Sequence, residues 1–325
     1  MTDKIYPLKF APIFKEKVWG GTRLKDILNK DIPFNTLIGE SWELTDRAHD
    51  VSIISNGYFA GKSLRVPMYE LGNALLGTRR TCDAWGRFPL LVKFLDASEK
   101  LSVQVHPNDK QAQQFEEDDP GKTEMWYVLY AEPHAKIIYG CDKKLADLYT
   151  HNNIDFSIEP LLHSYTIQAG DFIFVPAGQI HTMYGGCVIL EIQQNSDVTY
   201  RIYDWGRVGL DGLPRPLHFA KSLQCIDYEK PKNHIQHLAH ITEASVKLIN
   251  CPYFKAHYVS TSKYFTDECS GEMFKIIAPV YGAGSILFDK TKSISFRLGD
   301  IILLPAALGN YTIIPDSTIR FLLIS

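Results

Sequence analysis

The sequence predicts a mainly β protein with only a few short helices. The first observation is a series of short runs rich in β-branched and aromatic residues, bounded by glycine, proline, asparagine or aspartate. The second is the scarcity of helical periodicity along the 325 residues. The third is an internal repeat of a strand, a turn and a second strand. Many short strands at this spacing are typical of a sandwich, a jelly roll or a barrel.

The predicted strands lie in both halves of the chain. They cover residues 90–96, 100–106, 125–130, 135–140, 171–178, 187–194, 256–261, 274–282, 285–289, 300–306 and 319–325. Helices are predicted over residues 66–80, 109–118 and 142–152. Asn108 directly precedes the second of these helices and is a residue type that favours a helix start.

The internal repeat indicates a duplicated architecture. Residues 165–181 (YTIQAGDFIFVPAGQIH) align without gaps with residues 294–310 (ISFRLGDIILLPAALGN), matching a Gly-Asp pair and a Pro-Ala pair. A Gly-Asp turn that leads into an apolar strand, ended by proline, accounts for both pairs. At the last aligned position the first copy has His181 and the second has Asn310. We therefore expect that only the first copy kept a functional site.

A charged segment separates the two copies. The stretch EKPKNHIQHLAHITE interrupts the β pattern with charged residues and with His234, His237 and His240. This histidine spacing is typical of a solvated loop or helix face, with metal binding as the alternative. The sequence thus predicts two domains, residues 1–230 with the functional site and residues 241–325 as a degenerate β domain.

Composition narrows the class of partner. The formal net charge of −3 and the pI of about 6.4 give no electrostatic case for nucleic acid or an anionic membrane. Small anionic substrates remain compatible, because they need only a local cluster of lysine and arginine. The N-terminus lacks the apolar run of a signal peptide, and no segment approaches the ~20 apolar residues of a membrane-spanning helix. The six cysteines are scattered without a C-x-x-C pair, which favours buried thiols in a reducing cytosol.

One predicted strand has a polar face. Residues 101–109 (LSVQVHPND) alternate apolar and polar side chains until the proline. Because successive strand residues face opposite sides, Ser102, Gln104 and His106 share one face, and Lys100 extends this row. The row either faces solvent or lines a site.

Four residues have side chains that can ligate a divalent ion. They are Gln104 and His106 on the polar face, Glu124 at the start of the next predicted strand, and His181 beyond its Pro-Ala turn. Imidazole and carboxylate are zinc ligands, and an amide oxygen can complete the set. The alternatives are structural: His106 caps a turn and His181 packs in the core. Glu124 then pairs with Lys122.

Five short motifs carry a resemblance to a known family. They are Val18-Trp19-Gly20-Gly21, Gly39-Glu40-Ser41-Trp42-Glu43-Leu44, LSVQVHPND, Lys122-Thr123-Glu124-Met125 and, more loosely, Glu191 through Ser196-Asp197 to Arg201. On these matches the chain resembles type I phosphomannose isomerase (mannose-6-phosphate isomerase) in its short bacterial form. The matches span residues 10 to 207.

The resemblance implies a fold, a cofactor and an activity. The fold is a cupin-type double-stranded β-helix (jelly roll), duplicated, in agreement with the repeat. The cofactor is zinc, one ion per chain, held by Gln104, His106, Glu124 and His181. The activity is a cytoplasmic isomerisation of mannose 6-phosphate and fructose 6-phosphate through an enediol, so that the partner is a small sugar phosphate. The expected assembly is a monomer or a homodimer.

Three residues are the predicted catalytic groups. Glu191 is a candidate base, because desolvation within its apolar run would raise its pKa, and a salt bridge across the sheet is its alternative role. Lys122 is the other candidate, since desolvation can bring the pKa of a lysine into range. Arg201 is always charged and is assigned to stabilising the enediolate. Asp197 is interpreted as a structural residue that orients Arg201.

The phosphate ligands are less well defined. Lys100 and Ser102 are predicted to bind phosphate because they share the polar face with Gln104. Longer relatives have a lysine proposed for phosphate after the catalytic arginine, whereas this chain reads YRIYDWGR over residues 200–207. Arg207 is a candidate replacement because a guanidinium suits a phosphate, and an ordinary surface arginine is the alternative.

Two other functions remain open at the level of sequence. A non-catalytic cupin sensor would bind a sugar or sugar phosphate without the proton-transfer groups, and the three predicted catalytic residues disfavour it. An iron oxygenase is disfavoured by Gln104 as a ligand and by the lack of a His-x-His motif. Trp42 and Trp126 are expected to pack in the core rather than to stack on a sugar.

Overall fold

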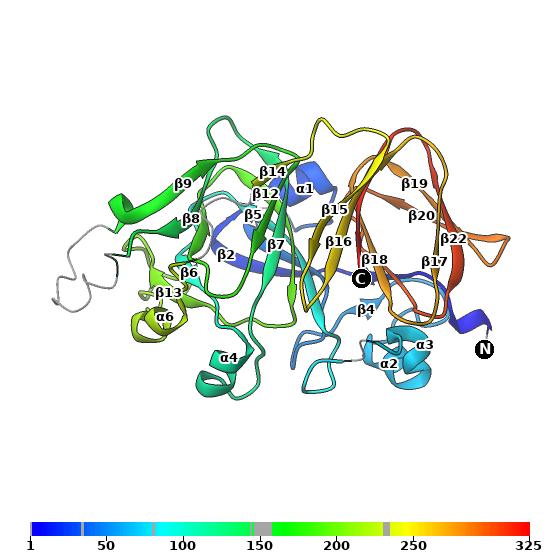
Figure 1. The fold of residues 1–325 in the computed structure, drawn as a ribbon, viewed down its shortest axis with the longest axis horizontal. Coiled ribbons are helices and arrows are strands. Elements are labelled where there is room, and N and C mark those ends of the chain that lie inside the picture. Colours follow the sequence, from blue (N-terminus) through cyan, green and yellow to red (C-terminus); the bar gives the residue numbers. More distant parts are fainter. Residues whose placement is uncertain (1, 34–35, 80–81, 144, 146–157, 230–234) are drawn as a thin grey trace.

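The structure is a computed structural model that describes residues 2–33, 36–79, 82–143, 145, 158–229 and 235–325. Antiparallel strands dominate it, and the helices are short, which confirms the mainly β prediction. Figure 1 shows two β units side by side, with most of the short helices along one edge of the molecule.

The N-terminal unit consists of two sheets. Its strands are β2 (Ile13–Gly21), β3 (Ile38–Leu44), β5 (Leu90–Ala97), β6 (Val103–Val105), β7 (Glu124–Ala131), β8 (Lys136–Cys141), β9 (Leu162–Thr166), β10 (Asp171–Val175), β11 (His181–Met183), β12 (Cys187–Gln194), β13 (Tyr200–Tyr203) and β14 (Ile235–His237). The seven-stranded sheet has the order β14-β10-β7-β12-β5-β3-β2, and the five-stranded sheet has the order β13-β6-β11-β8-β9. The two sheets enclose the predicted site between them.

The C-terminal unit repeats this two-sheet plan. Its strands are β1 (Leu8–Ala11), β4 (Ile53–Ile54), β15 (Ala244–Asn250), β16 (Lys255–Thr261), β17 (Phe265–Cys269), β18 (Lys275–Tyr281), β19 (Ala283–Phe288), β20 (Lys292–Arg297), β21 (Ile302–Leu304), β22 (Gly309–Pro315) and β23 (Ile319–Ile324). A seven-stranded sheet, β15-β16-β23-β18-β21-β1-β4, faces a four-stranded sheet, β17-β22-β19-β20.

Strands cross between the two predicted domains. β1 and β4 come from the N-terminal part of the chain but complete the C-terminal sheet, where Leu8 pairs with Leu303. In the opposite sense, β14 comes from the predicted linker and pairs with β10, so that His237 lies opposite Asp171. Each β unit therefore contains strands from both parts of the chain, and the division into domains at residues 1–230 and 241–325 stays a prediction.

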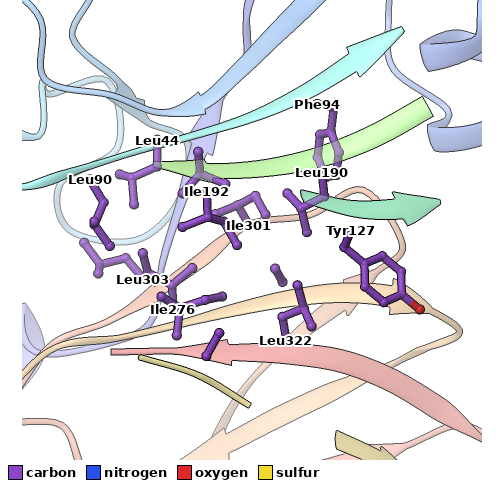
Figure 2. Close-up of a cluster of buried hydrophobic side chains, with 14 of the residues drawn as sticks. Leu44, Leu90, Phe94, Tyr127, Leu190, Ile192, Ile276, Ile301, Leu303 and Leu322 are labelled. Atoms are coloured by element: carbon purple, nitrogen blue, oxygen red, sulfur yellow. The ribbon is translucent and has the colours of Figure 1, made fainter. Parts of the chain in front are cut away.

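The core between the two units explains their association. Figure 2 shows apolar side chains of the two seven-stranded sheets meeting face to face, among them Leu190 and Ile192 of β12 and Leu303 and Leu322 of the C-terminal sheet. All four side chains are fully buried. Burial of this much apolar surface is the dominant favourable term in the association of two sheets.

The same contact decides what the inner face of β12 carries. Because strand residues alternate between faces, Val188, Leu190 and Ile192 point into the core between the units. Ile189 and Glu191 then point into the N-terminal unit. Both faces of this strand are buried, as its fully buried pattern shows. Charged residues on the inner face are thus isolated from bulk water.

The helices are short and locally determined. They are η1 (Thr2–Lys4), α1 (Arg23–Leu28), α2 (Arg65–Leu71), α3 (Asn73–Leu76), α4 (Asp109–Phe115), η2 (Glu159–Leu161) and α6 (Phe219–Cys225). Asn108 caps α4 with its side chain, and Gln111 returns a hydrogen bond to the cap, so the predicted start is confirmed. Gly72, with φ of 50°, breaks the predicted helix over residues 66–80 into α2 and α3. Most of the helix predicted over residues 142–152 lies outside the described residues.

The internal repeat is confirmed as a structural repeat. Gly170 and Gly299 both have φ of 90° and occupy the turns that precede β10 and β21. Only glycine adopts this conformation without strain, which explains the matched Gly-Asp pairs. The last aligned residues also correspond, because His181 begins β11 and Asn310 lies in β22.

Two further expectations concern cysteines and histidines. All six cysteines are free thiols. His234 lies outside the described residues, while His237 Nδ1 lies 2.6 Å from Asp171 Oδ1. Within the described ranges, neither His237 nor His240 belongs to a cluster of metal-ligating side chains.

No helix in the described part of the chain is both long and apolar enough to cross a bilayer.

Candidate metal centre and active site

The site lies between the two sheets of the N-terminal unit. β6 and β11 are neighbours in the five-stranded sheet, and Gln104 lies directly opposite His181 in their ladder. Glu124 is the first residue of β7 in the opposing sheet. His106 follows the end of β6 by one residue. The fold therefore collects side chains that are up to 77 positions apart in the sequence.

Three of the predicted ligands form a compact buried cluster. The ligating atoms of His106, Glu124 and His181 all lie within 4.8 Å of one another. His106 Nε2 is 3.6 Å from one carboxylate oxygen of Glu124, and His181 Nε2 is 3.4 Å from the other. The three side chains are almost wholly buried. In the part of the chain that the structure describes, this is the one group of three such side chains.

The backbone fixes the orientation of both imidazoles. His106 Nδ1 lies 2.7 Å from the carbonyl oxygen of Val198, and His181 Nδ1 lies 2.9 Å from that of Gln179. Each Nδ1–H can donate to its carbonyl, which leaves the lone pair of Nε2 directed toward Glu124. Metal-binding histidines commonly hold their tautomer in this way. Burial lowers the pKa of His181 to about 4, and burial followed by the charge on Lys122 lowers the pKa of His106 well below its usual range. Both rings are therefore neutral at physiological pH.

Gln104 extends the cluster. Its Nε2 lies 3.2 Å from His181 Nε2, and Ser102 Oγ donates to its Oε1 at 3.4 Å. A half-turn of the terminal amide exchanges the nitrogen and the oxygen with little change in shape. Gln104 can thus present an oxygen to a cation beside His181, while its nitrogen donates to Ser102.

The donor set fits a divalent cation. Both carboxylate oxygens of Glu124 are buried and accept no hydrogen bond among the described residues, which is costly for an anion unless a cation lies beside it. The Lys122 ammonium supplies part of this compensation, at 2.7 Å from Glu124 Oε2 and 3.2 Å from His106 Nε2. Two neutral imidazole nitrogens, a carboxylate and an amide oxygen form a ligand set that suits zinc and similar ions.

A polar cavity of about 240 Å³ opens beside the cluster. Its walls include six of the residues singled out by the sequence: Ser102, Gln104, Lys122, Glu191, Asp197 and Arg201. The three predicted catalytic residues therefore face one space. This volume lies slightly below the range of roughly 300–1,000 Å³ that is typical of small-molecule sites.

Glu191 is a buried carboxyl held by two donors. Trp126 Nε1 donates to its Oε1 at 2.9 Å, and the Lys93 ammonium lies 3.5 Å from its Oε2. Burial, followed by the nearby charge of Glu124, raises the pKa of Glu191. The salt bridge considered from the sequence is present, and the same carboxyl also lines the cavity. The indole of Trp126 additionally meets the His181 ring edge-on at 5.3 Å, so it links the carboxyl to the ligand cluster.

Sequence reasoning missed an ion network behind Glu191. The ammonium of Lys93 lies 3.6 Å from Glu40, which in turn lies 3.2 Å from Lys17. Trp42 Nε1 donates to Glu40 at 2.6 Å. Burial alone would raise the pKa of Glu40, but the charges on Lys93 and Lys17 bring it down to about 2. A lysine in the middle of the apolar run LLVKFLD was the available signal, because a buried lysine needs an anionic partner.

Comparison with known proteins assigns the chain to a family. Residues 8–135 match the family model described as phosphomannose isomerase type I, catalytic domain. The mannose-6-phosphate isomerase ManA of Bacillus subtilis (strain 168) is 36% identical over 307 residues, covering 94% of this chain and 95% of that protein. The chain belongs to the type I phosphomannose isomerase family.

Other members of the family agree in sequence and in fold. The mannose-6-phosphate isomerase of Streptococcus mutans is 33% identical over 307 residues, covering 94% of each chain. The crystal structure of the mannose 6-phosphate isomerase from Bacillus subtilis has a TM-score of 0.83 at 33% identity and covers 98% of each chain. The cupin-type β fold expected of the phosphomannose isomerase family is confirmed by this match.

Lys100, a predicted phosphate ligand, and Arg207, the candidate replacement, do not line the cavity. The Lys100 ammonium lies 3.2 Å from Glu159 and over the ring of Trp205, 4.2 Å from its centroid. Arg207 binds Asp204 at 2.9 Å and donates to the carbonyl of Lys100. Both cations have anionic or aromatic partners outside the cavity wall. Ser102, in contrast, is buried and lines the cavity.

Arg201 and Asp197 line the same cavity without an ion pair between them among the described residues. Arg201 donates through Nη1 to the carbonyl of Pro216 at 2.8 Å, and its Nε is buried without an acceptor among the described residues. Asp197 is exposed at the cavity wall and forms no ion pair with Arg201 in the described part of the structure. Its predicted orienting role therefore has no contact to support it. Trp42 and Trp126 are buried, as the core-packing prediction expected.

The low pKa of Glu40 predicts a pH-dependent contribution to stability. A carboxyl with a folded-state pKa below its unfolded-state pKa stabilises the protein above the unfolded value, and this contribution is lost as the pH falls toward the folded value. The pKa of Glu40 drops from 4.5 to about 2, which corresponds to about 3 kcal/mol. We expect Glu40→Gln to lower the free energy of unfolding by this order at pH 7, with the deficit shrinking below about pH 4.5. Urea unfolding at several pH values measures it.

The exposed Glu16 of the adjacent strand provides a matched control for this experiment. Glu16→Gln should leave the free energy of unfolding within about 0.5 kcal/mol of the parent protein at every pH. A deficit in Glu40→Gln that stays constant from pH 7 to pH 3 would contradict the assignment of the low pKa to Glu40.

Proposed function

We propose that the protein interconverts mannose 6-phosphate and fructose 6-phosphate, as a metal-dependent aldose–ketose isomerase. The observation that carries this proposal is a buried cluster of metal-ligating side chains beside a cavity that also presents Lys122, Glu191 and Arg201. The substrate class is supported by the names of the relatives that share 33–36% of their residues with this chain over nearly its whole length. The site supplies what the reaction requires: ligands for a cation that would stabilise developing negative charge, and groups that can move protons.

His106, Glu124, His181 and Gln104 would hold the metal, which we take to be one zinc ion per chain. Bound zinc acts as a Lewis acid that stabilises negative charge on the oxygens of an enediolate. The burial of the three charged or ionisable ligands and the fixed tautomers of both histidines prepare the site for a dication. Lys122 lies where it also adds positive charge beside Glu124.

The reaction moves two protons, one between C1 and C2 and one between the two oxygens. We assign the carbon-bound proton to Glu191, because its raised pKa brings a carboxyl toward the working pH of a base. Lys122 is assigned to the oxygen-bound proton, because its ammonium is buried between Glu124 and His106 and faces the cavity. Arg201 is assigned to stabilising the enediolate through its unpaired Nε–H. Ser102 contributes a hydroxyl to the same wall.

The alternative of a non-catalytic sugar sensor is not favoured. A sensor needs the cavity but has no use for a carboxyl held with a raised pKa beside a buried ammonium. The predicted cytoplasmic location and the predicted monomeric or homodimeric state stay predictions. We propose that the functional site lies in residues 1–230 and that residues 241–325 form a degenerate domain without a site.

A coupled assay with and without metal tests the proposal. Purified protein should form fructose 6-phosphate from mannose 6-phosphate, and prolonged chelation should remove at least about 99% of this activity, since a Lewis acid contributes several kcal/mol to the barrier. Addition of zinc should restore it, and elemental analysis should find one metal per active chain. Absence of isomerase activity in the metal-replete protein would reject the proposed function. Full activity after verified metal removal would reject the metal-dependent mechanism.

A further inference from the structure

Three arginines gather around one carboxylate beside the cavity. Arg215 donates through Nε to Asp204 at 2.7 Å and through Nη2 to the other carboxylate oxygen. Arg207 binds the same carboxylate through Nε at 3.0 Å. Arg201 comes from the adjoining strand β13 and is joined to this loop by its bond to the carbonyl of Pro216. Arg207 and Arg215 thus share a single carboxylate partner, while the bond of Arg201 goes to a backbone carbonyl.

Arg215 has one edge free. Asp204 occupies the Nε–Nη2 edge of its guanidinium, while Nη1 has no acceptor among the described residues. Arg215 lines the cavity, together with Arg201, whose buried Nε also has no acceptor in the described structure. A buried donor without an acceptor is costly unless a ligand supplies one.

The other cations of the cavity wall already have anionic partners. Lys17 pairs with Glu40, Lys93 with both Glu40 and Glu191, and Lys122 with Glu124. The exposed Asp197 is the remaining anion of the wall, and within the described residues it forms no ion pair with either arginine. Arg207 and Arg215 share the one carboxylate of Asp204, and Arg201 has no anionic partner among the described residues, so the surplus of positive charge in the cavity lies at Arg201 and Arg215.

We propose that Arg215 binds the phosphate group of the substrate, with Asp204 and Arg207 as positioning residues. A guanidinium presents paired N–H donors that match a phosphate, and Arg215 retains such donors after Asp204 has fixed one edge. Arg207 is not placed for this role, because it does not line the cavity and its Nε and Nη1 donate to Asp204 and to the carbonyl of Lys100. The inference rests on the proposed function, since it assigns the phosphate of that substrate.

Kinetics with phosphorylated and unphosphorylated sugar test this assignment. We expect Arg215→Gln to raise the KM for mannose 6-phosphate by at least about tenfold while kcat changes less, since an interaction made equally in ground and transition states affects KM alone. The inhibition constant of inorganic phosphate should rise by a similar factor. Turnover of unphosphorylated mannose, measured at high concentration, should be unaffected. Arg215→Lys should recover part of the loss, because a lysine keeps the charge without the fork.

Further variants separate positioning from contact. Asp204→Asn should raise the KM for mannose 6-phosphate, but by a smaller factor than Arg215→Gln, with unchanged metal content. Arg79→Gln is the matched control, because Arg79 is exposed and pairs only with Glu272 among the described residues. It should leave KM and kcat unaltered.

The outcomes distinguish this inference from the proposed function. If the parent protein isomerises mannose 6-phosphate but Arg215→Gln leaves its KM unchanged, or weakens both sugars equally, the role of Arg215 is rejected and the proposed function stands. If the parent protein shows no isomerase activity, the proposed function is rejected. In that case, titration calorimetry with inorganic phosphate decides the anion site: binding that Arg215→Gln abolishes supports it, and binding that survives the substitution rejects it.

Discussion

Glu124→Gln should lose the metal and reduce kcat/KM by at least about 10³-fold. The substitution keeps the size of the side chain but removes the one carboxylate in the cluster of His106, Glu124 and His181. A neutral amide is a much weaker partner for a dication, and the buried Lys122 ammonium then repels the cation without compensation. Several kcal/mol of charge stabilisation are lost with the metal, which corresponds to this change in rate. Elemental analysis and steady-state kinetics measure the two effects separately.

Glu117→Gln is the control for this variant, because Glu117 is an exposed carboxylate in the same part of the chain. It should retain one metal per chain and full activity. Circular dichroism should show that Glu124→Gln keeps its β structure, since the core between the units lies on the other face of the seven-stranded sheet. A folded Glu124→Gln protein with full metal content would contradict the assignment of Glu124 as a ligand.

β5 and β12 were predictable because burial on both faces dictates a nearly continuous apolar composition, whereas β3, which is also buried throughout, was missed. The run CVILEIQQ forms β12 over its full length, and the run LLVKFLD forms β5. β1 and β4 were not predicted, because a strand of two to four residues has no periodicity to recognise. Their pairing with the C-terminal sheet depends on contacts between distant segments, which no local pattern contains.

The candidate site was predictable to the extent that it follows strand alternation. Alternation places Gln104 on the polar face of β6, and the end of the repeat marks His181. The adjacency of these two residues is a property of topology, because β11 pairs with β6 across a long connection. In the sequence analysis, the family motifs and not the strand pattern implied that Gln104 and His181 belong to one site.

Lys93 and Arg215 show two reasons why other residues were missed. Lys93 lies in a run that was correctly predicted as a strand, but its role depends on Glu40 from a different strand. Arg215 lies outside any strand or motif, in the loop that follows β13, and only the folded loop brings it to the cavity. Loop residues of this kind carry function but have no sequence periodicity.

Glu191→Gln should reduce kcat by about 10²–10⁴-fold while the metal is retained. This is the range that a positioned general base contributes to a proton transfer. Trp126 and Lys93 can still donate to the amide oxygen of glutamine, so the side chain keeps its place while it loses the ability to accept a proton. Because Glu191 is no member of the ligand cluster, metal content should equal that of the parent protein. Glu132→Gln is the control, because Glu132 directly follows β7, is partly exposed and pairs with Arg23. This substitution should leave kcat unchanged.

The pH profile and hydrogen exchange then distinguish Glu191 from Lys122 as the base at carbon. A base must be deprotonated to act, so the activity of the parent protein should fall as the pH drops through the raised pKa of Glu191. This acid limb should be missing from the residual activity of Glu191→Gln and present in Lys122→Met. Exchange of the C1 hydrogen of fructose 6-phosphate with deuterated water should likewise be lost in Glu191→Gln. If exchange survives in Glu191→Gln but is lost in Lys122→Met, the two assignments must be interchanged, because the carbon-bound proton would then pass through the ammonium beside Glu124.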